Sequence, residues 1–149
     1  MPEQETLERA RKDRDEGKAP STQAGEFIRE EMHHIREGKH GARSTKQAIA
    51  IGLSKARRAG VKLPPPQKGK ASAETRRGAK RDYAKGLRGT GKRPSVTRSR
   101  ATLKALKREG HSAASHSALA RQARNSARRR TAAQRSAGAK KAAHTRQKS

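Results

Sequence analysis

Lysine and arginine side chains dominate the chemistry available to this chain. Of 149 residues, 39 are Lys or Arg and 13 are Asp or Glu, which gives a formal charge of +26. A cation that neutralises a phosphate releases condensed counterions, so charge and reach are enough to bind a phosphate polymer. The residues predicted to make such contacts are Lys55, Arg57, Arg58, Arg76, Arg77, Lys80, Arg81, Arg98, Arg100, Lys104, Lys107, Arg108, Arg121, Arg124, Arg128, Arg129 and Arg130.

Two groups of these cations recur at helical spacing. Arg100, Lys104, Lys107 and Arg108 follow an i, i+4, i+7, i+8 pattern, and Arg121, Arg124 and Arg128 are three and four residues apart. Residues at these spacings share one face of a helix, so each group predicts a basic stripe. The alternative is that the charges serve solubility alone. Solubility alone does not explain the uneven distribution of charge, because 32 of the basic residues but only three acidic residues follow residue 37.

His33, His34 and His40 form the one cluster that suggests a metal or catalytic site. On a helix His33 and His34 point about 100° apart, and no acidic or cysteine partner stands at convincing ligand spacing, although Glu30 and Glu37 are near. We therefore expect solvated histidines, no metal and no cofactor. A phosphate-binding loop, a dinucleotide turn and a serine elbow are also absent from the sequence. An enzyme with a small-molecule substrate is not expected; a histidine-dependent metal hydrolase or nuclease is the remaining alternative.

The composition limits the size of any core. Alanine makes up 26 of the 43 hydrophobic residues, which leaves 17 large apolar side chains, too few for a globular core of 149 residues. The absence of cysteine fits a reducing cytosol. The charged N-terminus has no apolar segment of a secretory signal, and the longest apolar run, 48–51, is too short to span a membrane. We expect a cytoplasmic, nucleoid location and no membrane partner.

The pattern of charge, proline and glycine predicts a mostly α-helical chain with substantial disorder. The first 17 residues carry Leu7 as their only sizeable apolar residue after Met1, so that helix should be solvated or frayed. The predicted parts are a charged N-terminal arm or helix (1–20), a small antiparallel helical hairpin (21–63), a Pro/Gly/basic linker (64–94), a basic helical pair (95–133) and a disordered basic tail (134–149).

The hairpin is the one unit with a predicted core. Ser21 is the expected N-cap of its first helix, and Ser44 or Thr45 that of the second. Val61 and Leu63 should close over its open end. The core residues predicted from helical spacing are Ile28, Met32, Ile35, Ile49 and Leu53.

The predicted hairpin is marginal by itself. Burial of nine apolar side chains does not by itself offset the conformational entropy that some 40 residues lose on folding. A ligand or a second copy would complete it. Ile51 projects about 200° from Ile49, so it is the candidate contact to a second copy in a homodimer, or to the chain beyond Val61.

The scarcity of aromatic residues indicates which kind of nucleic acid the chain could bind. Phe27 and Tyr83 are the only two, so the stacking platforms that read single strands and RNA loops are missing. Sequence-independent binding of duplex DNA by phosphate neutralisation, with bridging or compaction, is favoured over RNA. An RNA-binding or ribosome-associated basic factor is the alternative.

The segment EEMHHIREGKHGARSTKQAIAIGLSKARRAGVKLPPP, residues 30–66, resembles a family of small basic bacterial proteins of uncharacterised domain type, loosely described as DNA-binding. KQAIAI followed by LSKARRAG carries the resemblance. Gly52 stands where an alanine is expected, which could loosen the helix. The resemblance implies a nucleoid-facing role and identifies no catalytic residue. The C-terminal tail is similar in composition to linker-histone tails.

Overall fold

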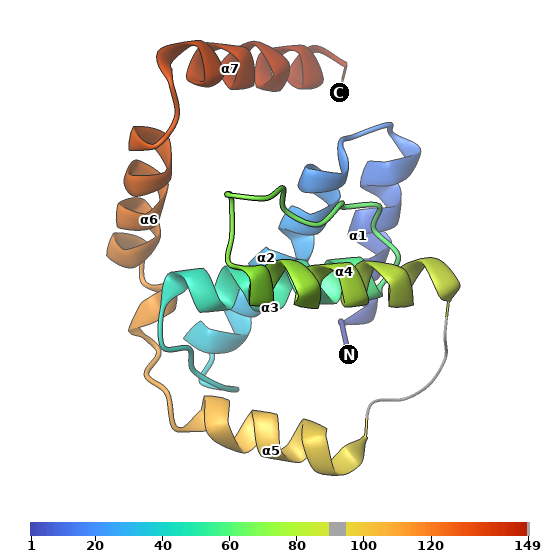
Figure 1. The fold of residues 1–149 in the computed structure, drawn as a ribbon, viewed down its shortest axis with the longest axis vertical. Coiled ribbons are helices and arrows are strands. Elements are labelled where there is room, and N and C mark those ends of the chain that lie inside the picture. Colours follow the sequence, from blue (N-terminus) through green and yellow to red (C-terminus); the bar gives the residue numbers. More distant parts are fainter. Residues whose placement is uncertain (90–94, 149) are drawn as a thin grey trace.

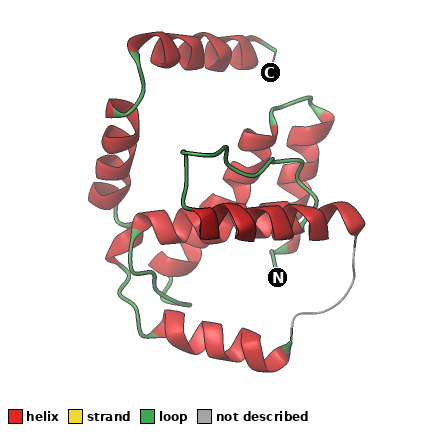
Figure 2. Cartoon of the chain, viewed as in Figure 1, coloured by secondary structure: helices red, strands yellow, loops and turns green. Residues whose placement is uncertain are grey.

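The computed structural model describes residues 1–89 and 95–148, and the regular elements in these ranges are helices. A single isolated bridge joins Lys68 and Ala71. The elements in chain order are α1 (Gln4–Asp15), α2 (Pro20–Arg36), α3 (Thr45–Arg58), α4 (Ala73–Arg88), α5 (Val96–Lys107), the short 3₁₀ helix η1 (Ser112–Ala114), α6 (His116–Arg128) and α7 (Ala132–Gln147) (Figure 1, Figure 2).

Helices α2 and α3 form the expected hairpin. The predicted cap at Ser21 is wrong, because Pro20, whose fixed φ suits the first turn, already starts α2. Gly38 adopts a φ of +74° and ends α2, and the Ser44 hydroxyl caps α3 by accepting a hydrogen bond from the Gln47 backbone N–H. Two short helices joined by a short loop pack antiparallel because their apolar faces cover each other.

Gly52 permits the close approach of the two hairpin helices. A Cβ atom at this position would lie 2.7 Å from the Cα of Ile28 and 2.9 Å from its backbone nitrogen. This contact explains the glycine where an alanine is expected: an alanine could not fit without moving the α2 backbone.

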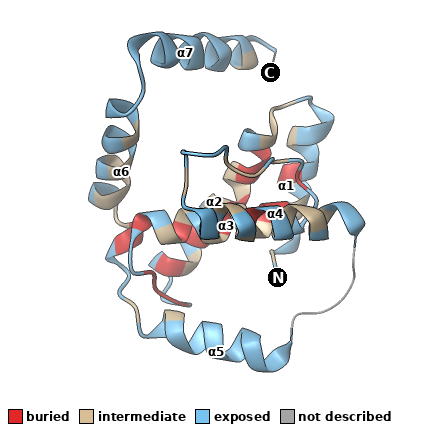
Figure 3. Ribbon diagram, viewed as in Figure 1, coloured by how far each residue is buried: buried red, intermediate tan, exposed pale blue. Residues whose placement is uncertain are grey.

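The core consists of two clusters of buried residues (Figure 3). The predicted core is confirmed, with Met32 and Ile35 buried and the other three members half-buried against the clusters. Ile51 is half-buried, and its contact to a second copy stays a prediction. One cluster holds Met32, Ile35, Ala42, Ala48, Ala113 and Ala114, with Ile28, Ile49 and Leu119 against it; the other holds Ala10, Ala24, Phe27, Ala56 and Val61, with Leu7, Leu53 and Leu63 against it.

Helix α1 packs against α2, contrary to the expected solvated or frayed helix. Thr6 is fully buried and Ala10 nearly so, while Leu7 lies half-buried against the second cluster. Small residues let the two helices come close without large apolar side chains. A count of large apolar residues misses such an interface.

The basic C-terminal part is helical where disorder was expected. Helix α7 occupies 132–147, within and just before the predicted disordered tail (134–149), and α4 packs on α3 inside the predicted linker. Alanine and arginine favour helix, and side-chain caps start three of these helices. The caps are Ser72 for α4, Ser115 for α6 and Thr131 for α7, the last in a reciprocal capping box with Gln134.

The segment between α5 and α6 is anchored in the hairpin. The Gly41 N–H donates to the Leu106 carbonyl over 2.9 Å, and Arg36 Nε donates to the Ala114 carbonyl over 2.8 Å. The Thr45 hydroxyl donates to the Ala113 carbonyl over 2.7 Å. These alanines belong to the first cluster, so residues of the predicted hairpin (21–63) and of the predicted basic pair (95–133) share a core.

Candidate functional site

Six of the thirteen Lys and Arg residues in 1–58 pair with acidic residues of the same unit. Arg9 contacts Glu5 and Glu26, Lys18 contacts Asp13 and Glu16, and Lys39 contacts Glu3 and Glu37. The N-terminal unit therefore neutralises much of its own charge.

Lys55 and Arg57 are not phosphate contacts in this structure, which corrects two of the predicted site residues. The Lys55 ammonium, on a side chain 17% exposed, pairs with Glu30 and Glu31. The Arg57 guanidinium is buried and donates from Nε to the Leu63 carbonyl over 3.2 Å. Burial lowers the pKa of Arg57. Lys55 faces α2 and Arg57 faces the segment after α3, and helical spacing alone cannot separate such internal cations from surface ones.

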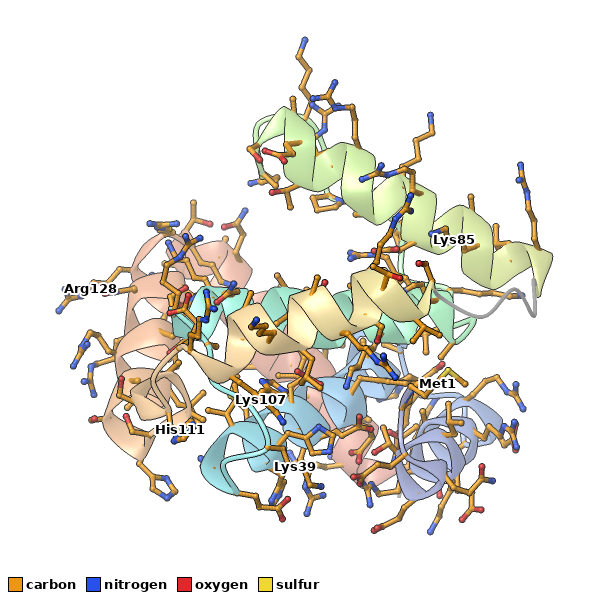
Figure 4. The ribbon with its side chains drawn as sticks, turned by 90° about the horizontal axis from the view of Figure 1, so that it is seen from below. Met1, Lys39, Lys85, Lys107, His111 and Arg128 are labelled. Carbon is orange, nitrogen blue, oxygen red and sulfur yellow. The ribbon has the colours of Figure 1, made fainter. Side chains whose placement is uncertain are left out.

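The remaining predicted cations lie at the surface. Arg76 is half-buried, and Arg58 is exposed beside Asp82, 3.8 Å away. The fully exposed members are Arg77, Lys80, Arg81, Arg98, Arg100, Lys104, Lys107, Arg108, Arg121, Arg124, Arg128, Arg129 and Arg130. Residues 95–148 contain 15 Lys and Arg and one acidic residue, Glu109, and none of these cations forms an ion pair within the part of the chain that the structure describes. Figure 4 shows such side chains projecting away from the ribbon, Lys85 and Arg128 among them.

The predicted basic stripe on α5 is confirmed as one surface. Arg100, Lys104, Lys107 and Arg108 line a shallow depression of about 410 Å³ together with Leu103. No buried residue lies on α5, so its whole length is accessible.

A second basic surface lies where the N-termini of α3 and α6 meet, which we call the α3–α6 groove. It has a volume of about 400 Å³ and is lined by three cations, Arg43, Lys46 and Arg121, with hydroxyl and amide side chains between them. No acidic residue lines it. The positive ends of two helix dipoles meet here, which favours an anion. Of the predicted phosphate-binding residues, only Arg121 lines this groove. The other two cations of the groove, Arg43 in the loop before α3 and Lys46 in its first turn, were not predicted.

The surface offers little for base stacking. Phe27 is buried in the second cluster and Tyr83 is half-buried on α4. Neither aromatic side chain therefore offers an exposed ring on which a base could stack.

A buried cluster of acidic and histidine side chains lies at the C-terminal part of α2 and in the loop that follows it. Glu31 is fully buried, and around it lie Lys55, His34 and His40. The expectation that all three histidines are solvated is wrong for His40, which is buried, and for His34, which is largely covered; His33 is exposed. The i, i+3 spacing of Glu31 and His34 could have predicted that these two side chains are neighbours on one face of α2. His40 lies in the loop after the helix, so no helical spacing predicts its contact with Glu31.

Hydrogen bonds hold two neighbouring carboxyl groups ionised. The pKa of Glu3 is lowered, first by its hydrogen bond from His34 and then by Lys39. Burial alone would raise the pKa of Glu30, but hydrogen bonds from the Thr6 hydroxyl, the Glu3 backbone N–H and Lys55 outweigh it and leave the pKa lowered.

The comparison with protein families matches residues 4–68 to a family of unknown function, DUF6496. The match covers α1, α2, α3 and the segment after α3, and includes the motif KQAIAI with LSKARRAG. It ends before α4, so the basic helices α4 to α7 lie outside it. No curated protein and no solved structure matches this chain significantly. None of the described helices has the length and apolar character needed to cross a membrane.

Proposed function

We propose that this chain is a non-enzymatic nucleic-acid-binding protein that binds duplex DNA without sequence preference. The observation that carries the proposal is the contrast in pairing: six of the thirteen cations of 1–58 form ion pairs within that unit, whereas the fifteen cations of 95–148 are all exposed and none of them forms an ion pair with a described residue. Exposed cations without acidic neighbours gain the most from phosphate contact, because binding releases condensed counterions.

The arrangement of the helices supports contact with more than one stretch of backbone. The α5 stripe and the α3–α6 groove lie on different elements, and α6 and α7 extend away from the N-terminal unit (Figure 1). A protein with two separate basic surfaces can bridge two duplexes or bend one around itself. Bridging or compaction in the nucleoid is the activity we propose for it.

The test is the salt dependence of binding to a random-sequence duplex, measured by fluorescence anisotropy. The logarithm of the binding constant should fall linearly with the logarithm of salt concentration, with a slope of about −0.9 for each phosphate neutralised. Replacing Arg43, Lys46 and Arg121 together by alanine should make the slope less steep by about 3. The matched control replaces Arg11, Lys12 and Arg14, three exposed cations of α1, and should leave the slope within about 1 of the wild type.

Two results would contradict the proposal. Affinity that hardly changes between low and high salt would exclude phosphate neutralisation, and equal losses in the two triple variants would exclude a defined basic surface. A clear preference for structured RNA over duplex DNA in competition would favour the alternative of an RNA-binding or ribosome-associated factor.

A further inference from the structure

The cluster around Glu31 has the composition of a metal site. Ligand atoms of Glu31, His34 and His40 all lie within 4.8 Å of one another. His40 Nε2 is 3.3 Å from Glu31 Oε2, and His34 Nδ1 is 3.9 Å from Glu31 Oε1. Two imidazoles and a carboxylate form a common three-ligand set for zinc.

Local structure brings the three side chains together. Glu31 and His34 are three residues apart on α2 and so share one face of the helix. Gly38, with its positive φ, ends the helix and turns the chain back, which places His40 beside that face. The cluster therefore joins α2 to the loop that holds α5 through the Gly41 N–H.

Hydrogen bonds orient both imidazoles with one nitrogen facing inward. His40 Nδ1 lies 3.0 Å from the Gly41 carbonyl, and His34 Nε2 lies 2.9 Å from Glu3 Oε1. Both partners are acceptors, so each ring can donate an N–H outward. His40 Nε2 and His34 Nδ1 then face Glu31 and are the nitrogens that would bind a metal ion. Metal-binding histidines are held in the same way, with the outer N–H donated to a carboxylate or carbonyl.

Glu31 lacks the partners that a buried carboxylate needs. Its side chain is 0% exposed, and within the described residues neither oxygen has a hydrogen bond of acceptable geometry. Lys55 is close enough for an ion pair, but it also pairs with Glu30 Oε1 at 3.1 Å, so one ammonium faces two buried carboxylates. A buried negative charge without full compensation is costly. A cation bound between Glu31, His34 Nδ1 and His40 Nε2 would supply the missing positive charge, and Lys55 would then pair with Glu30 alone.

We propose that Glu31, His34 and His40 bind a divalent transition metal ion of the zinc class. With bonds of about 2.0–2.2 Å, tetrahedral ligand atoms lie about 3.3–3.6 Å apart. The His40–Glu31 distance of 3.3 Å falls in this range, whereas the His34–Glu31 distance of 3.9 Å requires these side chains to close around the ion. The imidazole ligands favour zinc over magnesium and calcium, which prefer oxygen. The bound ion would tie α2 to the loop that anchors the basic helices, and the remaining tetrahedral position would take water.

The test is zinc titration of the full-length chain, freed of metal by chelation and of nucleic acid, by isothermal titration calorimetry. We expect one saturable site for Zn²⁺ and no comparable site for Mg²⁺. Bound Co²⁺ should show the visible absorption of a tetrahedral complex. Alanine at His34 or His40 should weaken zinc binding by at least about 100-fold. Glu3→Ala, which removes the outer partner of His34, should weaken it by about 10-fold to 100-fold.

His33→Ala is the matched control, since this exposed histidine is adjacent to His34 but outside the cluster. It should bind zinc as the wild type does. Circular dichroism checks that each variant folds, and Glu31→Gln, which keeps the shape of the side chain, tests the ligand set if an alanine variant does not fold. The absence of a saturable zinc site in the wild type would overturn the proposal, as would equal loss in His33→Ala and His34→Ala.

Discussion

Replacing Gly52 by alanine tests whether α2 and α3 approach as closely as the structure indicates. The added Cβ would lie 2.7 Å from the Cα of Ile28, whereas ordinary contacts begin at 3.4 Å. The helices would have to move about 0.7 Å apart at this point. A gap of this size along the rest of the interface forfeits a quarter to a half of the dispersion energy of the affected contacts.

The expected loss follows from two opposing effects. Overpacking a core costs about 1–3 kcal/mol, and the upper end applies because two of the nearest atoms belong to the backbone and cannot rotate away. Alanine in place of glycine inside a helix returns about 1 kcal/mol. The free energy of unfolding of Gly52→Ala should therefore fall by about 2 kcal/mol, measured by urea titration with far-UV circular dichroism.

Gly25→Ala is the matched control within the same hairpin. Gly25 lies inside α2, and a Cβ there would meet no atom within 4 Å, so the substitution should raise the free energy of unfolding by up to about 1 kcal/mol. The two variants should differ by about 3 kcal/mol. A Gly52→Ala protein as stable as Gly25→Ala would refute the close approach of the helices.

Three further substitutions, two of them paired with a control substitution, test other features of the structure. Lys55→Met leaves two buried carboxylates without their ammonium and should cost about 3–5 kcal/mol in urea unfolding, whereas the exposed Lys62→Met should cost under about 0.5 kcal/mol. Thr131→Ala removes the capping box of α7, a helix with no buried residue, and should cost that helix about 1 kcal/mol, visible in its NMR Cα shifts. Ser95→Ala, at an N-cap without a side-chain hydrogen bond, should leave the shifts of α5 unchanged. Gly86→Ala would place a Cβ 1.9 Å from a carbonyl oxygen of α3, so the amides of α4 should lose hydrogen-exchange protection while those of α2 keep it; unchanged protection in α4 would contradict this packing.

The hairpin could be predicted from the sequence because its signals are local. The spacing of Met32 and Ile35, the glycine at 38 and the cap at Ser44 each act within one or two helical turns. The basic stripe on α5 was predictable for the same reason, since residues four apart on a helix share a face whatever surrounds it. The prediction of disorder was wrong for the C-terminal helices, because alanine residues and side-chain caps stabilise helices that bury few of their side chains.

The sequence alone determined the helical class of the chain and the concentration of cations after residue 37, because helix propensity, caps and charge depend on each residue and its near neighbours. Only the tertiary structure decided which side chains face inward. It turned Lys55 from a surface cation into the partner of two buried glutamates, placed His40 against Glu31 and inserted Ala113 into the hairpin core. These contacts join different segments of the chain, and they are made by small or polar residues. The periodicity of large apolar residues in the sequence therefore does not predict them.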